Sequence, residues 1–323
     1  MNIFWVLISL FPGPLKKIAY RLKGCRIGSK VKIGFLCILN VGKGSYIDNG
    51  SRLGGCTYIK VGKLYMESYA RIAPFSYIKA PMVKLGRDSF ISNFVTIRSG
   101  HVSKRSELLV GDLVHVFPFV NLDCSRKIEI RREAAIGPKS DIYTHSAYKS
   151  VLDGYKVVYG DVVIGERAEL SYNIFVSPGV TIGADAICAC GSFINTDIPE
   201  GVLAAGQPAV VKRTKEQITT PIVEINAMQL LTEIIAKYRE DISLVTGRNP
   251  LEAFICDSGE SVFSREGVVY ICNYSNLDFG KIRNSGIFDI PHGLCVNKGV
   301  NQKDFAAFRK YLSRYGIRFI TQD

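Results

Sequence analysis

The segment IGERAELSYNIFVSPGVTIGADAICACGSFI, residues 164–194, decides the fold. Within it a small or branched apolar residue returns at every sixth position, at Ile164, Leu170, Val176, Ile182, Cys188 and Ile194. Neither an amphipathic helix nor an antiparallel strand has a period of six, so this fixed spacing predicts a solenoid of repeated coils.

The same period extends toward the N-terminus, with interruptions, from residue 27 onward. Its members are Ile27, Ile33, Val41, Ile47, Leu53, Ile59, Leu85, Ile91, Ile97, Val110, Val116, Leu122, Ile130, Ile136 and Ile142. If one aliphatic side chain per hexapeptide points inward, three hexapeptides close a triangular coil, and coils stack at the strand spacing of about 4.8 Å. We expect glycine and other small residues at the corners, because larger residues would not fit there or would need positive φ. The pattern predicts a parallel β-helix over residues 25–213.

Composition and charge limit the binding partners and the cellular compartment that can be expected. The chain of 323 residues is long enough for two domains, and its net charge of +12 favours polyanionic partners such as phosphates or acidic lipids. The basic residues are dispersed and form no nucleic-acid-binding module, so nucleic acid is not an expected partner. The nine cysteines include no C-x-x-C pair, which predicts reduced, buried thiols, no metal site and a cytoplasmic protein.

Residues 1–24 form a separate amphipathic segment. The apolar run from Ile3 to Phe11 is too short to span a bilayer, and after Pro14 apolar residues recur at helical spacing among Lys16, Lys17, Arg21 and Lys23. Such a basic amphipathic helix is typical of a peripheral anchor on an anionic membrane, here the inner face of the cell membrane. The alternative is a helix that caps the core of a domain, and the sequence leaves both open.

Beyond Arg213 the period of six stops. Apolar residues from Met228 to Ile242 follow one helical face, and the runs AFIC, SVFSREGVVYIC and SGIFDI read as strands. Asn301, with Asp304 three positions later, predicts the start of a last helix that ends at Gly316. Residues 214–323 are therefore expected to be a small α+β domain, for which the sequence indicates no function.

The segment VTIGADAICACGSFINTDIPEGVLAAGQPAVVKR, residues 180–213, resembles the closing signature of the hexapeptide-repeat acyltransferases, which include galactoside, maltose and xenobiotic acetyltransferases. The resemblance implies a mainly β protein built on a left-handed parallel β-helix, a homotrimer with active sites between neighbouring prisms, and no metal. It also implies an O-acetyltransferase that moves an acetyl group from acetyl-CoA to a hydroxyl or amine of a sugar or glycan precursor, in cell-surface polysaccharide biosynthesis.

The same resemblance implies site residues. Asp123 falls at the position that holds the acceptor hydroxyl, with Asn121 beside it as a substrate-binding residue. The cofactor would contact Tyr172, Cys190, Asn195, Thr196, Lys212 and Arg213, and an N–H near Tyr172 would bind the oxyanion. Two irregular inserts, residues 99–109 and the stretch after His145, support an enzyme, because loops that project from regular coils concentrate functional sites.

His145, in DIYTHSAY, is the expected general base, positioned opposite Asp123, because imidazole accepts and returns protons near neutral pH. Aligned without gaps, however, the family's histidine falls on Ala147, two residues later. The alternative is therefore a degenerate solenoid that acts as a trimeric scaffold or binding module. A two-residue change in where the chain leaves the coil would return the imidazole of His145 to the groove.

Overall fold

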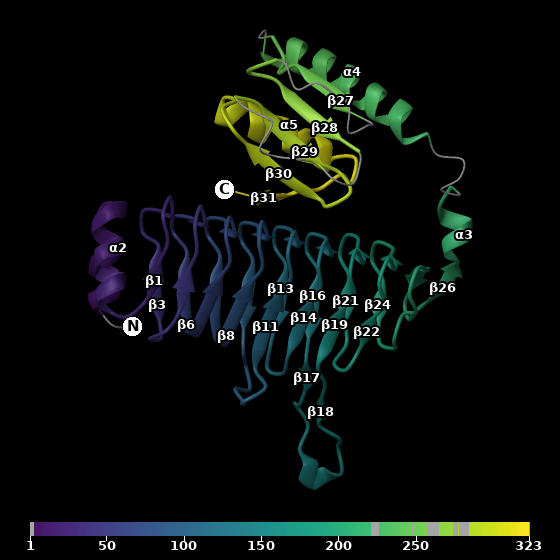
Figure 1. The fold of residues 1–323 in the computed structure, drawn as a ribbon. Coiled ribbons are helices and arrows are strands. Elements are labelled where there is room, and N and C mark those ends of the chain that lie inside the picture. The colour runs from purple at the N-terminus through teal and green to yellow at the C-terminus, as the bar shows by residue number, and fades with distance from the viewer. Residues whose placement is uncertain are drawn as a thin grey trace. The chain divides into compact units, whose positions relative to one another are not determined.

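The computed structural model describes residues 3–220, 226–246, 249–256, 265–273, 277 and 284–322. Contacts divide the chain after Thr219 into a unit that holds the coils and a second unit that follows it. Figure 1 shows the strands of the first unit stacked side by side from coil to coil, as the period of six predicts.

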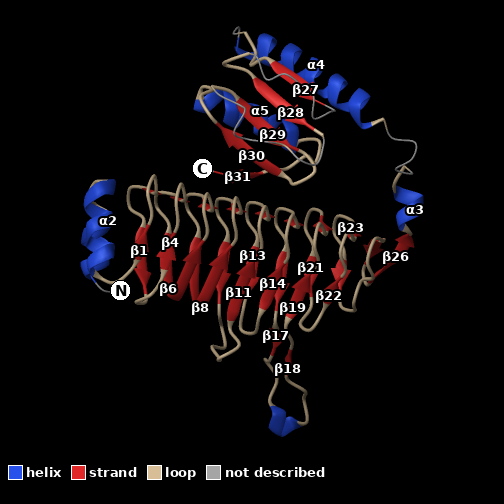
Figure 2. Ribbon diagram, in the orientation of Figure 1, coloured by secondary structure: helices blue, strands red, loops and turns tan. Residues whose placement is uncertain are grey.

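The first unit is a left-handed parallel β-helix whose coils have three faces (Figure 2). Face 1 contains β1 (Arg26–Ile27), β4 (Tyr46–Ile47), β11 (Glu107–Val110), β14 (Ile128–Ile130), β19 (Val162–Ile164) and β22 (Thr181–Ile182). Face 2 contains β2 (Lys32–Ile33), β5 (Arg52–Leu53), β7 (Arg71–Ile72), β9 (Phe90–Ile91), β12 (His115–Val116), β15 (Ala135–Ile136), β20 (Glu169–Leu170), β23 (Ile187–Cys188) and β25 (Leu203–Gly206). Face 3 contains β3 (Ile38–Val41), β10 (Thr96–Arg98), β13 (Asn121–Asp123), β16 (Asp141–Tyr143), β21 (Phe175–Val176) and β24 (Phe193–Ile194). The long strands β6 (Tyr58–Met66) and β8 (Tyr77–Leu85) pass from face 3 to face 1.

The periodic aliphatic residues form one continuous core along the axis of the prism. Ile164, Leu170, Val176 and Ile182 are fully buried, and each stacks on an equivalent residue of the preceding coil. Because each inward side chain meets a similar one in the next coil, the period read from the sequence also gives the stacking register.

The corners differ from the sequence-based expectation that only small residues occupy them. Phe75, Phe94 and Phe119 take φ of 62°, 59° and 63°, in the left-handed region that normally favours glycine. Their side chains remain exposed, so this left-handed position of the corner imposes no limit on size. The expectation holds at the corner position that follows the inward residue, where a Cβ on Gly54 or Gly137 would lie 2.2 Å and 1.7 Å from backbone atoms of the next coil. It fails at the left-handed position, where only the backbone conformation is restricted.

The N-terminal segment folds as α1 (Ile3–Ser9) and α2 (Gly13–Leu22) and closes the first coils. Trp5 and Tyr20 are buried and stack at 5.6 Å between ring centroids. Lys16 does not belong to the basic face expected from the sequence, because it is 1% exposed and its Nζ donates to the Gly34 carbonyl at 2.7 Å. One side of this segment therefore caps the core of the coils, as the domain-cap alternative predicts.

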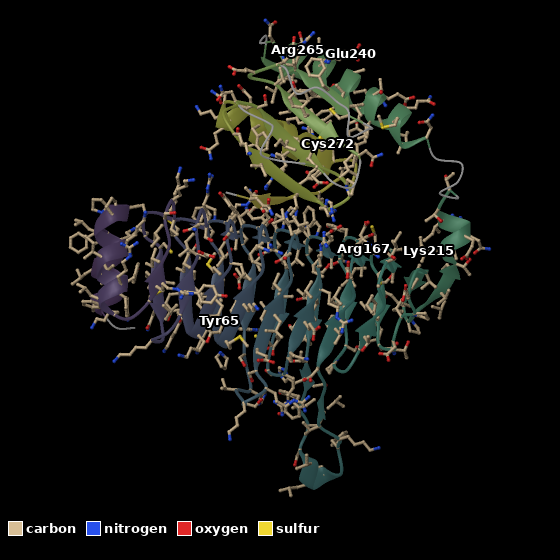
Figure 3. All side chains as sticks on the ribbon, in the orientation of Figure 1. Tyr65, Arg167, Lys215, Glu240, Arg265 and Cys272 are labelled. Carbon is tan, nitrogen blue, oxygen red and sulfur yellow. The ribbon has the colours of Figure 1, made fainter. Side chains whose placement is uncertain are left out.

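The other end of the prism is closed by β26 (Ala209–Arg213), which pairs antiparallel with β25, and by α3 (Lys215–Ile218). Lys215 and Arg167, both labelled in Figure 3, pair with the carboxylate of Asp185 at 3.4 Å and 2.7 Å. Because this contact fastens α3 to the coils, the first unit extends six residues beyond Arg213, where the period of six ends.

The second unit contains α4 (Ala227–Thr246), α5 (Gln302–Ser313) and a sheet in the order β27 (Ala253–Cys256), β28 (Val269–Cys272), β29 (Gly286–Asp289), β30 (Leu294–Asn297) and β31 (Ile320–Gln322). The pairing is parallel except between β29 and β30. Asn301 caps α5 by accepting from the Lys303 N–H at 2.9 Å, as its position in the sequence predicts. Residues 261–264, predicted as part of a strand, lie outside the described residues.

Candidate active site

The candidate site lies on the edge between faces 3 and 1, where the coils carry their insertions. Residues 99–106 separate β10 from β11, and residues 144–161 separate β16 from β19, whereas the coil between them makes the same turn in residues 124–127. The longer insertion contains β17 (His145–Ser146), the short helix η1 (Val151–Asp153) and β18 (Val158–Tyr159), and it projects from the prism as a hairpin (Figure 1). The two insertions therefore flank the coil that ends face 3 at Asp123.

Asp123 is a buried carboxylate held by its own turn. Its side chain is 3% exposed, and its Oδ1 accepts from the Ser125 N–H at 3.2 Å and from the Ser125 hydroxyl at 2.6 Å. Oδ2 lies 3.7 Å from Nε of the half-exposed Arg98. A buried carboxylate with fixed partners can orient and stabilise a neighbouring cation.

His145 is the neighbour of that carboxylate. Its Nδ1 lies 3.2 Å from Oδ1 of Asp123, without the angle of a regular hydrogen bond, and Nδ1 is fully buried. The side chain as a whole is 17% exposed, so the exposed surface belongs to atoms other than Nδ1. The pair therefore has the arrangement of a general base whose second ring nitrogen faces a carboxylate.

Thr144 explains where the chain leaves the coil. Its hydroxyl donates to the carbonyl of Asp123 at 2.7 Å and accepts from the Arg126 N–H at 2.9 Å. This link fixes the residue before His145 against the Asp123 turn, so the imidazole meets the carboxylate directly. Ala147 follows β17 and lies two positions farther along the hairpin.

His101 belongs to the cluster around His145, and sequence reasoning missed it. Its ring meets that of His145 edge to face at 4.7 Å between centroids, and its backbone N–H donates to the Ser125 hydroxyl at 2.9 Å. Tyr159 of β18 stacks on His145 at 6.2 Å and receives the Arg126 guanidinium over its ring at 4.0 Å. The insertion at residues 99–109 was recognisable in the sequence, but His101 belongs to no motif that would have identified it.

Cys124 and Gly100 lie next to the Asp123–His145 pair and affect which reactions and how much space are available there. Burial, and then the charge of Asp123, raise the pKa of the Cys124 thiol to about 12, so this cysteine does not supply a thiolate nucleophile near neutral pH. A Cβ placed on Gly100 would lie 3.4 Å from Asp123 Oδ2 and 3.6 Å from His145 Cε1. Glycine at this position therefore keeps the space beside the pair open.

Asn121 lies two residues before Asp123, but its side chain is turned along face 3. Its Nδ2 donates to Asp141 Oδ1 and to the Tyr143 hydroxyl, each at 3.1 Å. Because both contacts run to the next coil, the structure gives Asn121 a role in coil stacking. It does not join the cluster around His145.

The residues expected to hold the cofactor do not form one pocket within a single chain. Tyr172 and Cys190 are exposed on the edge between faces 2 and 3, where the Gly191 N–H donates to the Tyr172 carbonyl at 2.9 Å. Asn195 and Thr196 are exposed on the opposite edge of face 3, and Lys212 and Arg213 are exposed at the end of β26. A shallow depression of about 410 Å³ on face 3 lies between these groups and is lined by Asp141, Asn173, Ile174, Phe175, Gly191, Ser192, Phe193 and Gln207. Tyr172 is thus separated from His145 by the width of face 3.

The cysteines and acidic residues form no metal-binding cluster within the described part of the chain. Seven of the nine thiols are buried, as expected, whereas Cys56 and Cys190 are exposed at corners. The described helices include none with the length and apolar character needed to cross a membrane.

Comparison with known proteins gives the following similarities. No family model matches the chain. WcaF of Escherichia coli, which is named as an acetyltransferase of colanic acid biosynthesis, is 33% identical over 109 residues, or 34% of this chain and 59% of WcaF. YvoF of Bacillus subtilis, also named as an acetyltransferase, is 25% identical over 162 residues, or 50% of this chain and 81% of YvoF. The UDP-N-acetylglucosamine acyltransferase LpxA of Bacteroides fragilis is 16% identical, with a TM-score of 0.47 over 71% of this chain and 89% of LpxA. The resemblance to hexapeptide-repeat acetyltransferases is confirmed, although the chain spans less than two thirds of the length of WcaF.

Proposed function

We propose that this chain is a hexapeptide-repeat O-acetyltransferase that moves an acetyl group from acetyl-CoA to a hydroxyl of a sugar or glycan. The observation that carries the proposal is the pair of His145 and Asp123, 3.2 Å apart on the edge where both insertions leave the prism. Similarity to acetyltransferases supports the reaction class.

In the proposed mechanism, His145 accepts the proton of the acceptor hydroxyl while its oxygen attacks the thioester carbonyl carbon. The buried Asp123 carboxylate stabilises the imidazolium that forms. When the tetrahedral intermediate collapses, its C–S bond breaks and the imidazolium returns the proton to the leaving thiolate of coenzyme A. No covalent intermediate with the protein is needed, which agrees with the absence of a thiolate at Cys124.

Acetyl-CoA is the proposed donor, held in the coils that follow His145. Its contacts in this proposal are Tyr172, Cys190, Asn195, Thr196, Lys212 and Arg213. All are exposed, and they flank the depression on face 3 or lie at the end of β26. WcaF is named for colanic acid biosynthesis, which supports an acceptor from cell-surface polysaccharide biosynthesis.

We propose a homotrimer as the active assembly. Within one chain Tyr172 lies across face 3 from His145, so an N–H near Tyr172 would reach the reacting carbonyl from a neighbouring subunit. Phe75, Phe94 and Phe119 form an exposed ladder on the edge between faces 2 and 3, with centroids 5.2 Å and 5.0 Å apart. An exposed aromatic ladder is an apolar surface suited to contact with another prism.

The N-terminal cap supports a peripheral site on the inner face of the cell membrane. Its outer side exposes Phe4, Leu7, Leu10, Phe11, Leu15, Ile18 and Leu22, next to Lys17, Arg21 and Lys23. An apolar surface bordered by lysine and arginine is suited to an anionic bilayer.

The rival function is a scaffold that has lost catalysis, and Ala147 is the observation that favours it. The test compares acetyl transfer by the wild type, His145→Ala and Ala147→His, measured as free coenzyme A released from acetyl-CoA with a panel of saccharides. We expect His145→Ala to lower turnover by roughly a hundredfold or more. Undiminished turnover in His145→Ala would remove this residue from the mechanism, and an inactive wild type activated by Ala147→His would favour the scaffold.

A further inference from the structure

A column of cations on face 3 leads directly to the Asp123–His145 pair. Lys60 is in register with Lys79, Lys79 with Arg98, and Arg98 with Asp123, each on the next coil. The three cationic side chains are exposed and repeat at the spacing of the coils, about 4.8 Å. We call Lys60, Lys79 and Arg98 the cation column.

Arg98, at the end of the cation column, pairs with Asp123 at 3.7 Å, whereas the segments that carry Lys60 and Lys79 contain no acidic residue. Residues 38–43, 58–63, 77–82 and 96–106, which form face 3 before Asp123 and its edge toward face 1, include no aspartate or glutamate. Lys43 and Lys63 add further charge on this edge, where the Lys63 ammonium donates to the Lys43 carbonyl. Like charges directly opposite each other on neighbouring strands are destabilising, so the arrangement carries a cost that an anionic ligand would offset.

Aromatic rings accompany the charges. Tyr58 and Tyr77 precede Lys60 and Lys79 by two positions and therefore lie on the same outward side of face 3. Their rings stack at 5.3 Å with 12° between the ring planes. The stacked pair therefore lies on the same side of face 3 as the ammonium groups of Lys60 and Lys79, and an apolar surface next to cations fits the apolar and anionic parts of an acidic sugar.

From this arrangement we infer that the acceptor is an anionic saccharide that lies along face 3 over the coils preceding Asp123, with its negative charges on Lys60, Lys79 and Arg98. This inference rests on the proposed acetyl transfer, in which acetyl-CoA occupies the coils that follow His145. Donor and acceptor would then approach the pair from opposite ends of the prism. The shared ligand chemistry is anionic carbohydrate, whose charge is either carboxylate along a chain or diphosphate at one end.

The test uses the full chain and three saccharide probes. A hyaluronan tetrasaccharide carries carboxylates, UDP-N-acetylglucosamine carries a diphosphate, and chitotetraose is neutral. Binding is measured by calorimetry for the wild type and for the double variant Lys60→Gln/Lys79→Gln. The matched control is Lys32→Gln/Arg52→Gln, which removes the same charge from an equivalent exposed column on face 2 that does not lead to Asp123.

We expect the wild type to bind one anionic probe more tightly than chitotetraose, and the anionic probe that binds identifies the source of the charge. The face 3 double variant should lose roughly tenfold in affinity, the scale of two exposed charge pairs, whereas the control should change less than twofold. The difference should shrink at about 1 M salt, where charges are screened beyond roughly 3 Å. No preference for an anionic probe, no binding at all, or an equal loss in both double variants would overturn the inference.

Acetyl transfer to the same probes separates this inference from the proposed function. If the cation column governs binding but no probe is acetylated, the reaction is contradicted and the anionic saccharide site stands. If chitotetraose is acetylated as well as the anionic probes by the wild type and by the face 3 double variant, the reaction stands and the site is contradicted.

Discussion

Replacing Asp123 by asparagine tests the proposed pair most directly. Asparagine keeps an oxygen that can accept both bonds from Ser125, but it removes the negative charge beside His145. Two unit charges about 4 Å apart interact by about 4 kcal/mol at an effective dielectric constant of about 20. Because the His145 side chain is 17% exposed, water screens part of this energy, and about 2–3 kcal/mol remains for the transition state. The expected loss in kcat/KM is therefore roughly 30- to 150-fold.

The assay is the release of free coenzyme A at saturating acetyl-CoA, with circular dichroism and thermal unfolding to verify the fold. Asp112→Asn is the matched control. Asp112 is also a carboxylate held by hydrogen bonds, from the Arg87 N–H at 2.6 Å and the Arg87 guanidinium at 2.8 Å, but it lies on the edge between faces 1 and 2. This control should keep its activity. A folded Asp123→Asn protein with more than a third of wild-type kcat/KM would refute the reasoning, because the carboxylate would then contribute little to proton transfer.

Three further predictions concern assembly, donor and membrane. Phe94→Arg places a charge in the aromatic ladder and should convert a trimer to monomers at micromolar concentration in light scattering; an intact trimer would contradict the ladder as the interface. Cys190 should react with a thiol reagent in the native protein, and the labelling rate should fall at least several-fold when acetyl-CoA is added. An unchanged labelling rate would count against the proposed donor site. The double variant Leu7→Ser/Ile18→Ser leaves the buried side of the cap intact and should lose binding to anionic vesicles in flotation, while binding equal to that of the wild type would show that these side chains do not contact lipid.

Much of the fold followed from local spacing. Most inward positions from Ile27 to Ile194 were predictable because consecutive faces usually repeat a six-residue step, and stacked coils must place equivalent residues above one another. Val41 was predicted wrongly: it is only partly buried, and Leu39, six residues after Ile33, is the inward residue of that face. Asn301 and the helix it caps were predictable for a similar reason, since a cap depends on only three or four consecutive residues.

Which side of the N-terminal segment is buried was not predictable from its helical period. Helical spacing groups Leu15, Ile18, Ala19 and Leu22 together, yet only Ala19 of these four packs against the core. The buried residues of the segment are instead Trp5, Ile8, Ser9, Lys16 and Tyr20. Which side of a short helix is buried depends on the surface that it meets, and that surface is the end of the first coils.

The sequence by itself determined that a hexapeptide solenoid carries an insertion beginning at His145, and it pointed to Asp123 as its partner. Only the tertiary structure decided that the two side chains lie 3.2 Å apart, that His101 packs against His145, and that Asn121 turns toward the next coil. The physical reason is that a regular period places every residue of a coil, whereas an insertion has no period. The position of its first side chain is fixed by contacts such as the Thr144 bond to Asp123, which joins residues 21 positions apart.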